Sequence, residues 1–176
     1  MSARGFRTTA LLPLLALLLA GGACGYRVVG YGGQLPGGIS RVEVPVFENH
    51  TPRKDVGRVL TEHFIDQLLG SAKVRVATGE EAQALILGTV TSYRREPITF
   101  DSKQKPLENR LTIIMDVKLV TRVERRLLFG EKGVIVRYDY PIKTDLQEND
   151  RLEDEALRSA SEQMSQKLVS LMLESF

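Results

Sequence analysis

Apolar residues recur along this chain with two different periods. Alternating apolar and polar positions predict strands over Ile39–Phe47, Ala84–Arg94 and Leu111–Leu119, because successive side chains of a strand point to opposite faces. A fourth strand is expected over 127–138, with a bulge or turn at Gly130–Gly133. These segments predict a sheet of roughly four strands.

Two further segments have the i, i+3, i+4, i+7 spacing of an amphipathic helix. The first is expected to begin at Thr51-Pro52, with threonine as N-cap and proline in the first turn, and to end at Gly70. The second runs from Asn149 to Phe176, capped by Asn149 or Asp150. Grouped strands with helices before and after them predict an α+β two-layer sandwich, with two helices on one face of a mixed sheet.

The first block of the chain follows neither period. Arg4 and Arg7 precede a nearly continuous Leu/Ala run over 10–20, and Gly21-Gly22-Ala23 follows. A charged start, an apolar core of about ten residues and a small-residue cleavage site are the parts of a signal peptide. The run is too short to span the roughly 30 Å hydrocarbon core of a bilayer. We therefore predict that residues 1–23 are removed.

Cys24, the only cysteine, directly follows this small-residue run. A lone cysteine is usually a small buried apolar residue, but here it lies where lipoprotein signal peptidase would cut. We predict that Cys24 carries diacylglycerol and an acyl chain that anchor the protein in a membrane. Gly25 after it is compatible with the outer membrane, facing the periplasm. Residues 24–40 are read as a Gly-rich tether and 41–176 as one domain.

Charge and motif content remove several classes of function. Of 24 basic residues, Arg4 and Arg7 leave with the signal peptide, so 22 basic residues balance 22 acidic ones. Binding to nucleic acid would need a basic excess on the domain, and none is present. No cluster has metal-ligand spacing, and no cofactor is expected beyond the acyl groups on Cys24. GxSxG, GxGxxG and P-loop motifs are missing from the sequence.

The polar residues that could still take part in catalysis have simpler explanations. His63 lies on the apolar stripe of the first helix, where a hydrogen-bonded, partly buried histidine is common, and His50 shapes the loop after the first strand. Glu153, Asp154 and Glu155 at the start of the second helix complement its dipole on a solvated face. A periplasmic hydrolase is therefore the least favoured function, and we predict a protein that is not an enzyme.

Two basic loops remain as candidate binding sites. The link over 97–109 carries Lys103 and Lys105, and the link over 140–144, before the last helix, carries Lys143. Loops between strands often hold binding residues, and lysines beside apolar residues suit a ligand with phosphates and acyl chains. Simple solvation is the alternative for each lysine.

Taken in order, several segments resemble the lipopolysaccharide-assembly lipoprotein family, LptE. The resemblance rests on Cys24-Gly25-Tyr26 at the lipid site, on LPGGI at 35–39 and on VPVFEN at 44–49. The strand LGTVTSY at 87–93, the pattern around Asn109-Arg110-Leu111 and the closing amphipathic helix add to it. The likeness covers essentially the whole mature chain.

The resemblance implies a two-helix, four-strand sandwich inside the lumen of a large outer-membrane β-barrel, LptD. There the lipoprotein would act as plug and assembly aid and would contact lipopolysaccharide. By position, the family's lipid-contacting basic residues correspond to Lys103, Lys105 and Lys143. The alternative is an envelope lipoprotein that regulates or assembles another machine, such as peptidoglycan synthesis or fibre secretion, and that binds a periplasmic domain or a multimeric pore.

Overall fold

Six strands form one mixed sheet in the computed structural model, which describes residues 35–174 of the chain. Among the three long strands, the central one is antiparallel to both of its neighbours. The three short strands pair in parallel, with one another or with one long strand. The order across the sheet is β3-β1-β4-β5-β6, and β2 also pairs with β4. The strands are β1 (Arg41–Glu43), β2 (Glu48–Asn49), β3 (Arg75–Val76), β4 (Ala84–Phe100), β5 (Pro106–Thr121) and β6 (Leu127–Pro141).

The mixed sheet is confirmed, but the expected number of about four strands is too small. The strand predicted over Ile39–Phe47 is divided, because Pro45 lies between β1 and β2 and has no N–H to donate to a neighbouring strand. The N–H of Phe47 is also lost to the sheet, since it donates to the Thr61 hydroxyl of the first helix at 2.9 Å. The remaining pieces, like β3, are only two or three residues long.

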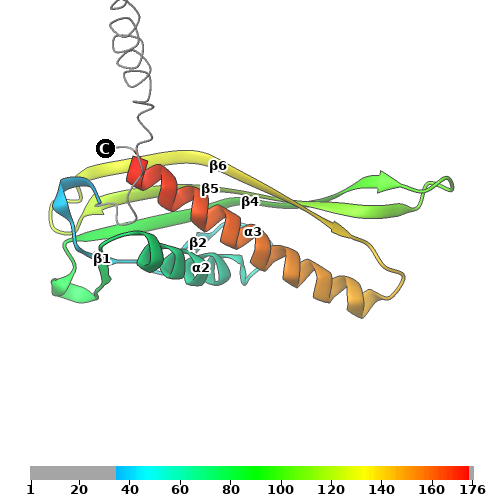
Figure 1. The fold of residues 1–176 in the computed structure, drawn as a ribbon, viewed down its shortest axis with the longest axis horizontal. Helices are drawn as coiled ribbons and strands as arrows, with labels where there is room; N and C mark the ends of the chain where they lie inside the picture. The colour runs from blue at the N-terminus through cyan, green and yellow to red at the C-terminus, as the bar shows by residue number, and fades with distance from the viewer. Residues whose placement is uncertain (1–34, 175–176) are drawn as a thin grey trace, which may run out of the picture. The chain divides into compact units, whose positions relative to one another are not determined.

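Two α-helices, α2 (Val56–Ser71) and α3 (Leu146–Glu174), lie together on one face of the sheet (Figure 1). The prediction of an α+β sandwich with both helices on one face is therefore confirmed. Two 3-10 turns, η1 (Pro36–Gly38) and η2 (Gly79–Glu81), complete the elements of the described part. Among residues 35–174, no helix has the length and apolar character needed to cross a membrane.

Both helices begin away from the predicted residues. The Asn49 carboxamide accepts hydrogen bonds from the N–H and hydroxyl of Thr51, and its Nδ2 donates to the Arg53 carbonyl at 2.7 Å. This side-chain turn uses the hydroxyl expected to cap the helix, so α2 begins only at Val56. α3 begins before Asn149, because Asp145 Oδ1 accepts the N–H of Glu148 at 2.8 Å.

The long strands follow the predicted alternation closely. The five inward-facing apolar residues of β5, from Leu111 to Leu119, are all fully buried. The bulge expected at Gly130–Gly133 is present, since the pairing of β6 with β5 shifts register between Glu131 and Val134, and Gly133 has a φ of 66°. Asp116 Oδ1 accepts the Gly133 N–H at 2.8 Å and holds this bulge against β5.

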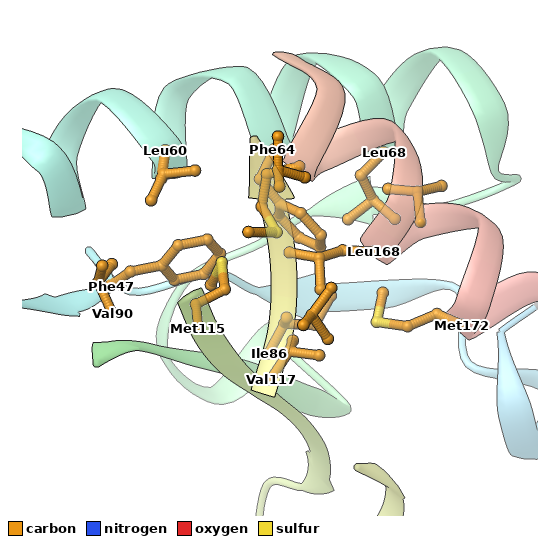
Figure 2. Close-up of a cluster of buried hydrophobic side chains, with 14 of the residues drawn as sticks. Phe47, Leu60, Phe64, Leu68, Ile86, Val90, Met115, Val117, Leu168 and Met172 are labelled. Carbon is orange, nitrogen blue, oxygen red and sulfur yellow. The ribbon is translucent and has the colours of Figure 1, made fainter. Parts of the chain in front are cut away.

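The core lies between the inward face of β4 and β5 and the facing stripes of the two helices (Figure 2). Phe64 of α2 and Phe47 meet at its centre, with ring centroids 5.3 Å apart and planes inclined by 59°, the tilted arrangement that aromatic pairs prefer. Met115 and Leu168 come to the same cluster from β5 and α3. The domain is therefore held together around contacts among segments that are distant in sequence.

The domain begins earlier than residue 41, the predicted boundary. Leu35 and Ile39 are buried in the core on either side of the η1 turn and form a bridge with each other. The described end of the predicted 24–40 tether is thus folded, because two apolar side chains bracket a Pro-Gly-Gly turn that returns the chain to the core. Residues 1–34, with the predicted signal peptide and Cys24, lie outside the described residues.

Gly57 provides a test of how closely α2 packs on the segment before β2. A Cβ atom at Gly57 would lie 2.4 Å from the carbonyl oxygen of Phe47, whereas a Cβ atom at Gly70 of the same helix would have nothing within 4 Å. Gly57→Ala is expected to destabilise the protein by about 1–2 kcal/mol despite the higher helix propensity of alanine. Urea unfolding measures this change in free energy.

Gly70→Ala is the matched control for Gly57→Ala, because it makes the same substitution in the same helix without a clash. It is expected to leave stability unchanged or to raise it by up to about 1 kcal/mol. Equal effects of the two variants would contradict the close approach of α2 to the Phe47 carbonyl.

Candidate functional site

The link predicted over 97–109 is mostly strand. β4 continues to Phe100 and β5 begins at Pro106, so only residues 101–105 connect them. Register shifts on either side of Thr99 absorb the irregularity at Pro97, which the sequence pattern suggested as a strand end. The predicted loop is therefore the end of a long β-hairpin that extends beyond the helices (Figure 1).

Asp101 holds the turn that displays two of the predicted lysines. Its Oδ1 accepts the N–H groups of Lys103 at 2.8 Å and Lys105 at 2.9 Å, and its own N–H donates to the Lys105 carbonyl. Gln104 takes the positive φ of 62° that this turn requires. Because the backbone is fixed in this way, the exposed Lys103 and Lys105 side chains project from the hairpin tip.

Lys143 lies at the same end of the domain. The N–H of Ile142 donates to the Leu107 carbonyl at 2.8 Å, so the end of β6 runs beside the start of β5. Lys143 comes next, and the Asn149 side chain binds both its N–H at 2.7 Å and its carbonyl at 2.8 Å. Lys143 and Lys105 therefore belong to the same end of the sheet, each within two residues of the Ile142–Leu107 hydrogen bond.

This end of the domain is both basic and apolar. Phe100 and Leu107 are 47% and 44% exposed, and Leu146 in the first turn of α3 is 80% exposed. Within residues 35–174, none of the three lysines forms an ion pair. We call Lys103, Lys105 and Lys143 with these three apolar residues the basic end. It offers unpaired cations beside exposed apolar surface.

A second polar cluster was not expected from the sequence. Glu153, predicted to lie on a solvated face of the last helix, is buried and only 7% exposed. It accepts hydrogen bonds from the Tyr93 hydroxyl at 2.8 Å, from Arg53 Nη1 at 3.1 Å and from Arg95 Nη1. The prediction was wrong because Glu153 lies four residues before buried Leu157, on the inward stripe of α3. The i, i+4 spacing from Glu153 to Leu157 is the sequence feature that could have predicted its burial.

Opposite charges in this cluster stabilise one another. Arg53 also pairs with Asp55 at 2.8 Å and with Asp154, and its hydrogen bond lowers the pKa of the Asp55 carboxyl. Burial, and next the hydrogen bond to Glu153, raise the pKa of Tyr93, so its phenol stays protonated as a donor. The cluster joins the turn before α2, the strand β4 and the helix α3 where the hairpin leaves the body of the domain.

The histidines take the places expected from the sequence. His63 is half-buried on α2, and the exposed His50 has its Nε2 3.8 Å from Glu48 Oε2. In the described part of the chain, no three His, Cys, Asp or Glu residues are grouped so that they could hold a metal ion.

Comparison with known proteins identifies the family. The sequence model of the LptE lipopolysaccharide-assembly family matches residues 39–172, which include β1 and nearly all of α3. The chain belongs to the LptE family. The resemblance seen in the sequence is confirmed, and the family is one of lipopolysaccharide-assembly proteins. No curated protein matches the chain.

Solved structures share the fold at low sequence identity. A predicted lipoprotein from Caulobacter crescentus CB15 is 12% identical with a TM-score of 0.54, over 74% of this chain and 89% of that one. Uncharacterized lipoprotein B from Nitrosomonas europaea is 14% identical with a TM-score of 0.51, over 83% and 91%. The PelC dodecamer subunit from Paraburkholderia phytofirmans is 16% identical with a TM-score of 0.51, over 81% and 95%.

Proposed function

We propose that this LptE-family chain is an outer-membrane lipoprotein that plugs the LptD β-barrel, helps to assemble it and binds lipopolysaccharide at the basic end. The observation that supports the binding role is the group of three unpaired lysines beside exposed apolar side chains. Lipopolysaccharide carries phosphates next to acyl chains. A lysine ammonium binds phosphate as a point charge, and Phe100 and Leu107 offer apolar surface to the chains.

The membrane attachment in this proposal is Cys24. Its position after Gly21-Gly22-Ala23 supports cleavage and acylation there. Two or three acyl chains, each contributing about 0.8 kcal/mol per buried CH2, would hold the protein firmly in the bilayer. The proposal needs no metal, cofactor or nucleic acid.

Binding of lipopolysaccharide is tested by reversing the charge of all three lysines in one variant. The variant Lys103→Glu, Lys105→Glu, Lys143→Glu is expected to bind purified lipopolysaccharide about 30-fold more weakly, since each exposed cation contributes somewhat under 1 kcal/mol to phosphate binding. Fluorescence titration with labelled lipopolysaccharide measures the dissociation constant. The circular dichroism spectrum checks that the variant is folded.

The matched control reverses three exposed lysines elsewhere, with the variant Lys54→Glu, Lys118→Glu, Lys132→Glu. It changes the net charge by the same amount and should retain the affinity of the unmodified protein. Equal losses in both variants would mean that binding depends on total charge, and the assignment to the basic end would then be wrong.

The partner is tested with the tagged, lipidated protein extracted from outer membranes in detergent. Recovery of one large β-barrel protein at about equal stoichiometry is the expected result. Recovery of a peptidoglycan synthase or of a small homo-oligomeric pore, with no barrel, would contradict the plug function and favour an assembly role in another envelope machine.

A further inference from the structure

A second group of cations lies at the other end of the sheet and is not used by the proposed function. Arg41 of β1 and Arg75 of β3 are register partners in neighbouring parallel strands, and both side chains are exposed. Together with the exposed Lys73 they border a shallow hollow of about 450 Å³, which Ser40 and Val74 also line. Among the described residues, no carboxylate lines it. Like charges side by side on adjacent strands repel each other unless an anion lies between them.

The surroundings of the hollow leave its positive charge uncompensated. Arg41 Nε donates to the backbone carbonyl of Glu81 at 2.8 Å, so this contact removes no charge. Within residues 35–174, none of the three cations forms an ion pair. Glu81, whose carbonyl Arg41 binds, and its neighbour Glu80 are exposed on η2, and Glu43 is paired with Arg122.

The backbone around the hollow is firmly held. The Gln83 side-chain oxygen accepts the N–H groups of Ser40 at 2.9 Å and Arg41 at 3.0 Å, and the Ser40 carbonyl accepts the Arg75 N–H at 2.8 Å. The two guanidinium groups are therefore presented from a fixed pair of strands.

The position of these cations points to their ligand. Arg41 follows closely on Leu35, the first described residue. Its strand β1 pairs with the start of β4 and lies at the end of the sheet opposite to the hairpin tip (Figure 1). An extended chain from Cys24 to Leu35 reaches at most about 36 Å, at roughly 3.3 Å per residue. An acyl anchor on Cys24 would therefore keep this end of the domain near the bilayer surface.

We propose that Arg41, Lys73 and Arg75 form a phosphate-binding surface that rests on anionic phospholipid headgroups of the membrane holding the lipid anchor. Cations on an anionic leaflet act over about one Debye length, roughly 8 Å at physiological salt. The open, shallow shape of the hollow suits a surface of headgroups. The proposal is independent of lipopolysaccharide binding at the basic end.

The test uses the full mature chain with Cys24→Ser, which lacks the acyl anchor, and co-sedimentation with vesicles. This Cys24→Ser protein is expected to bind vesicles of phosphatidylethanolamine with phosphatidylglycerol, and not vesicles of phosphatidylethanolamine alone. Adding Arg41→Gln and Arg75→Gln should lower the partition coefficient about 30-fold, since each cation near an anionic surface contributes about fivefold. Lys73→Gln, outside both strands, should lower it about fivefold and serves if the double variant is unfolded.

The matched control is Lys54→Gln with Lys132→Gln, which removes the same charge from exposed positions outside both proposed sites and should leave vesicle binding unchanged. Equal losses in the two double variants would overturn the proposal, because binding would then follow total charge. Displacement from the vesicles by inorganic phosphate at low concentration would also overturn it, since the hollow would then bind free phosphate. Lipopolysaccharide titration of the arginine variant should remain unchanged, which separates this test from that of the proposed function.

Discussion

Replacing Glu153 by alanine is expected to lower the free energy of unfolding by about 3 kcal/mol, the lower end of the range for breaking a buried ion pair. The buried carboxylate accepts hydrogen bonds from Tyr93, Arg53 and Arg95. Alanine would leave these three donors without their shared acceptor. The effect stays at the low end because Arg53 and Arg95 are partly exposed and can be rehydrated. Urea unfolding followed by circular dichroism measures the change.

Glu155→Ala is the control for this prediction. Glu155 lies two residues further along α3, is exposed and pairs only with Arg151 in an i, i+4 contact, so its removal should change stability by at most about 0.5 kcal/mol. Glu153→Gln keeps an acceptor for the Tyr93 hydroxyl, so its loss of unfolding free energy should lie between those of the two alanine variants. If Glu153→Ala were no more destabilising than Glu155→Ala, the cluster would not hold the helix to the sheet.

The Glu153 cluster can affect the proposed function because it holds the strand that leads to the hairpin tip. Glu153 binds Arg95 at the point where β4 leaves the cover of the helices and continues toward the hairpin tip. Loosening this contact is expected to increase amide hydrogen exchange in the outer part of β4, since local stability follows buried contacts. The position of Lys103 and Lys105 relative to Lys143 would then be less well defined.

The long strands were predictable from sequence because each has several apolar residues at period two. Leu111–Leu119 is the clearest case, and its inward residues are all buried. The number of short strands was not predictable: β2 and β3 have two residues each, too few to show a period, although 73–76 has β-like composition. Their pairing depends on where Pro45 and the Phe47 N–H are placed by the rest of the fold. The same limit explains why six strands were read as about four.

The predicted ends of helices and strands were wrong where a contact in the fold outweighed the local sequence pattern. Thr51-Pro52 is a good helix start by itself, but Asn49 binds the Thr51 hydroxyl and delays the helix. The strand predicted to end at Arg94 continues past Pro97 to Phe100, because register shifts around Thr99 accommodate the proline. In each case the deciding partner is a contact that composition and periodicity do not report.

The sequence named the lysines of the candidate site, but it did not predict the hairpin that carries two of them. Lys103, Lys105 and Lys143 were found from their loops, and the antiparallel pairing of β5 with both neighbours brings those loops to one end. Glu153 was missed because acidic residues at a helix start usually face solvent. The spacing from Glu153 to Leu157 shows that a carboxylate can occupy an apolar stripe when donors from another element meet it.

Replacing Phe64 by alanine is expected to have the largest effect on stability, a loss of about 3–5 kcal/mol, because a fully buried aromatic side chain would be replaced by a cavity. Its ring contacts Phe47 at the centre of the core, with centroids 5.3 Å apart. Urea unfolding measures the change, and calorimetry checks that the transition remains cooperative. Leu69→Ala on the same helix is the control, since Leu69 is 49% exposed and should lose less than about 1 kcal/mol.

A double-mutant cycle separates the aromatic contact from the cavity. Phe47→Ala and Phe64→Ala are combined, and the coupling between them is expected to be about 0.5–1.5 kcal/mol, as for other tilted aromatic pairs. Phe47 lies in the segment between β1 and β2, so this coupling measures how strongly α2 is held to that segment. Additive losses would mean that the two rings are buried independently. The contact between α2 and the VPVFEN segment would then depend on the Phe47 N–H bond to the Thr61 hydroxyl and on the close packing at Gly57.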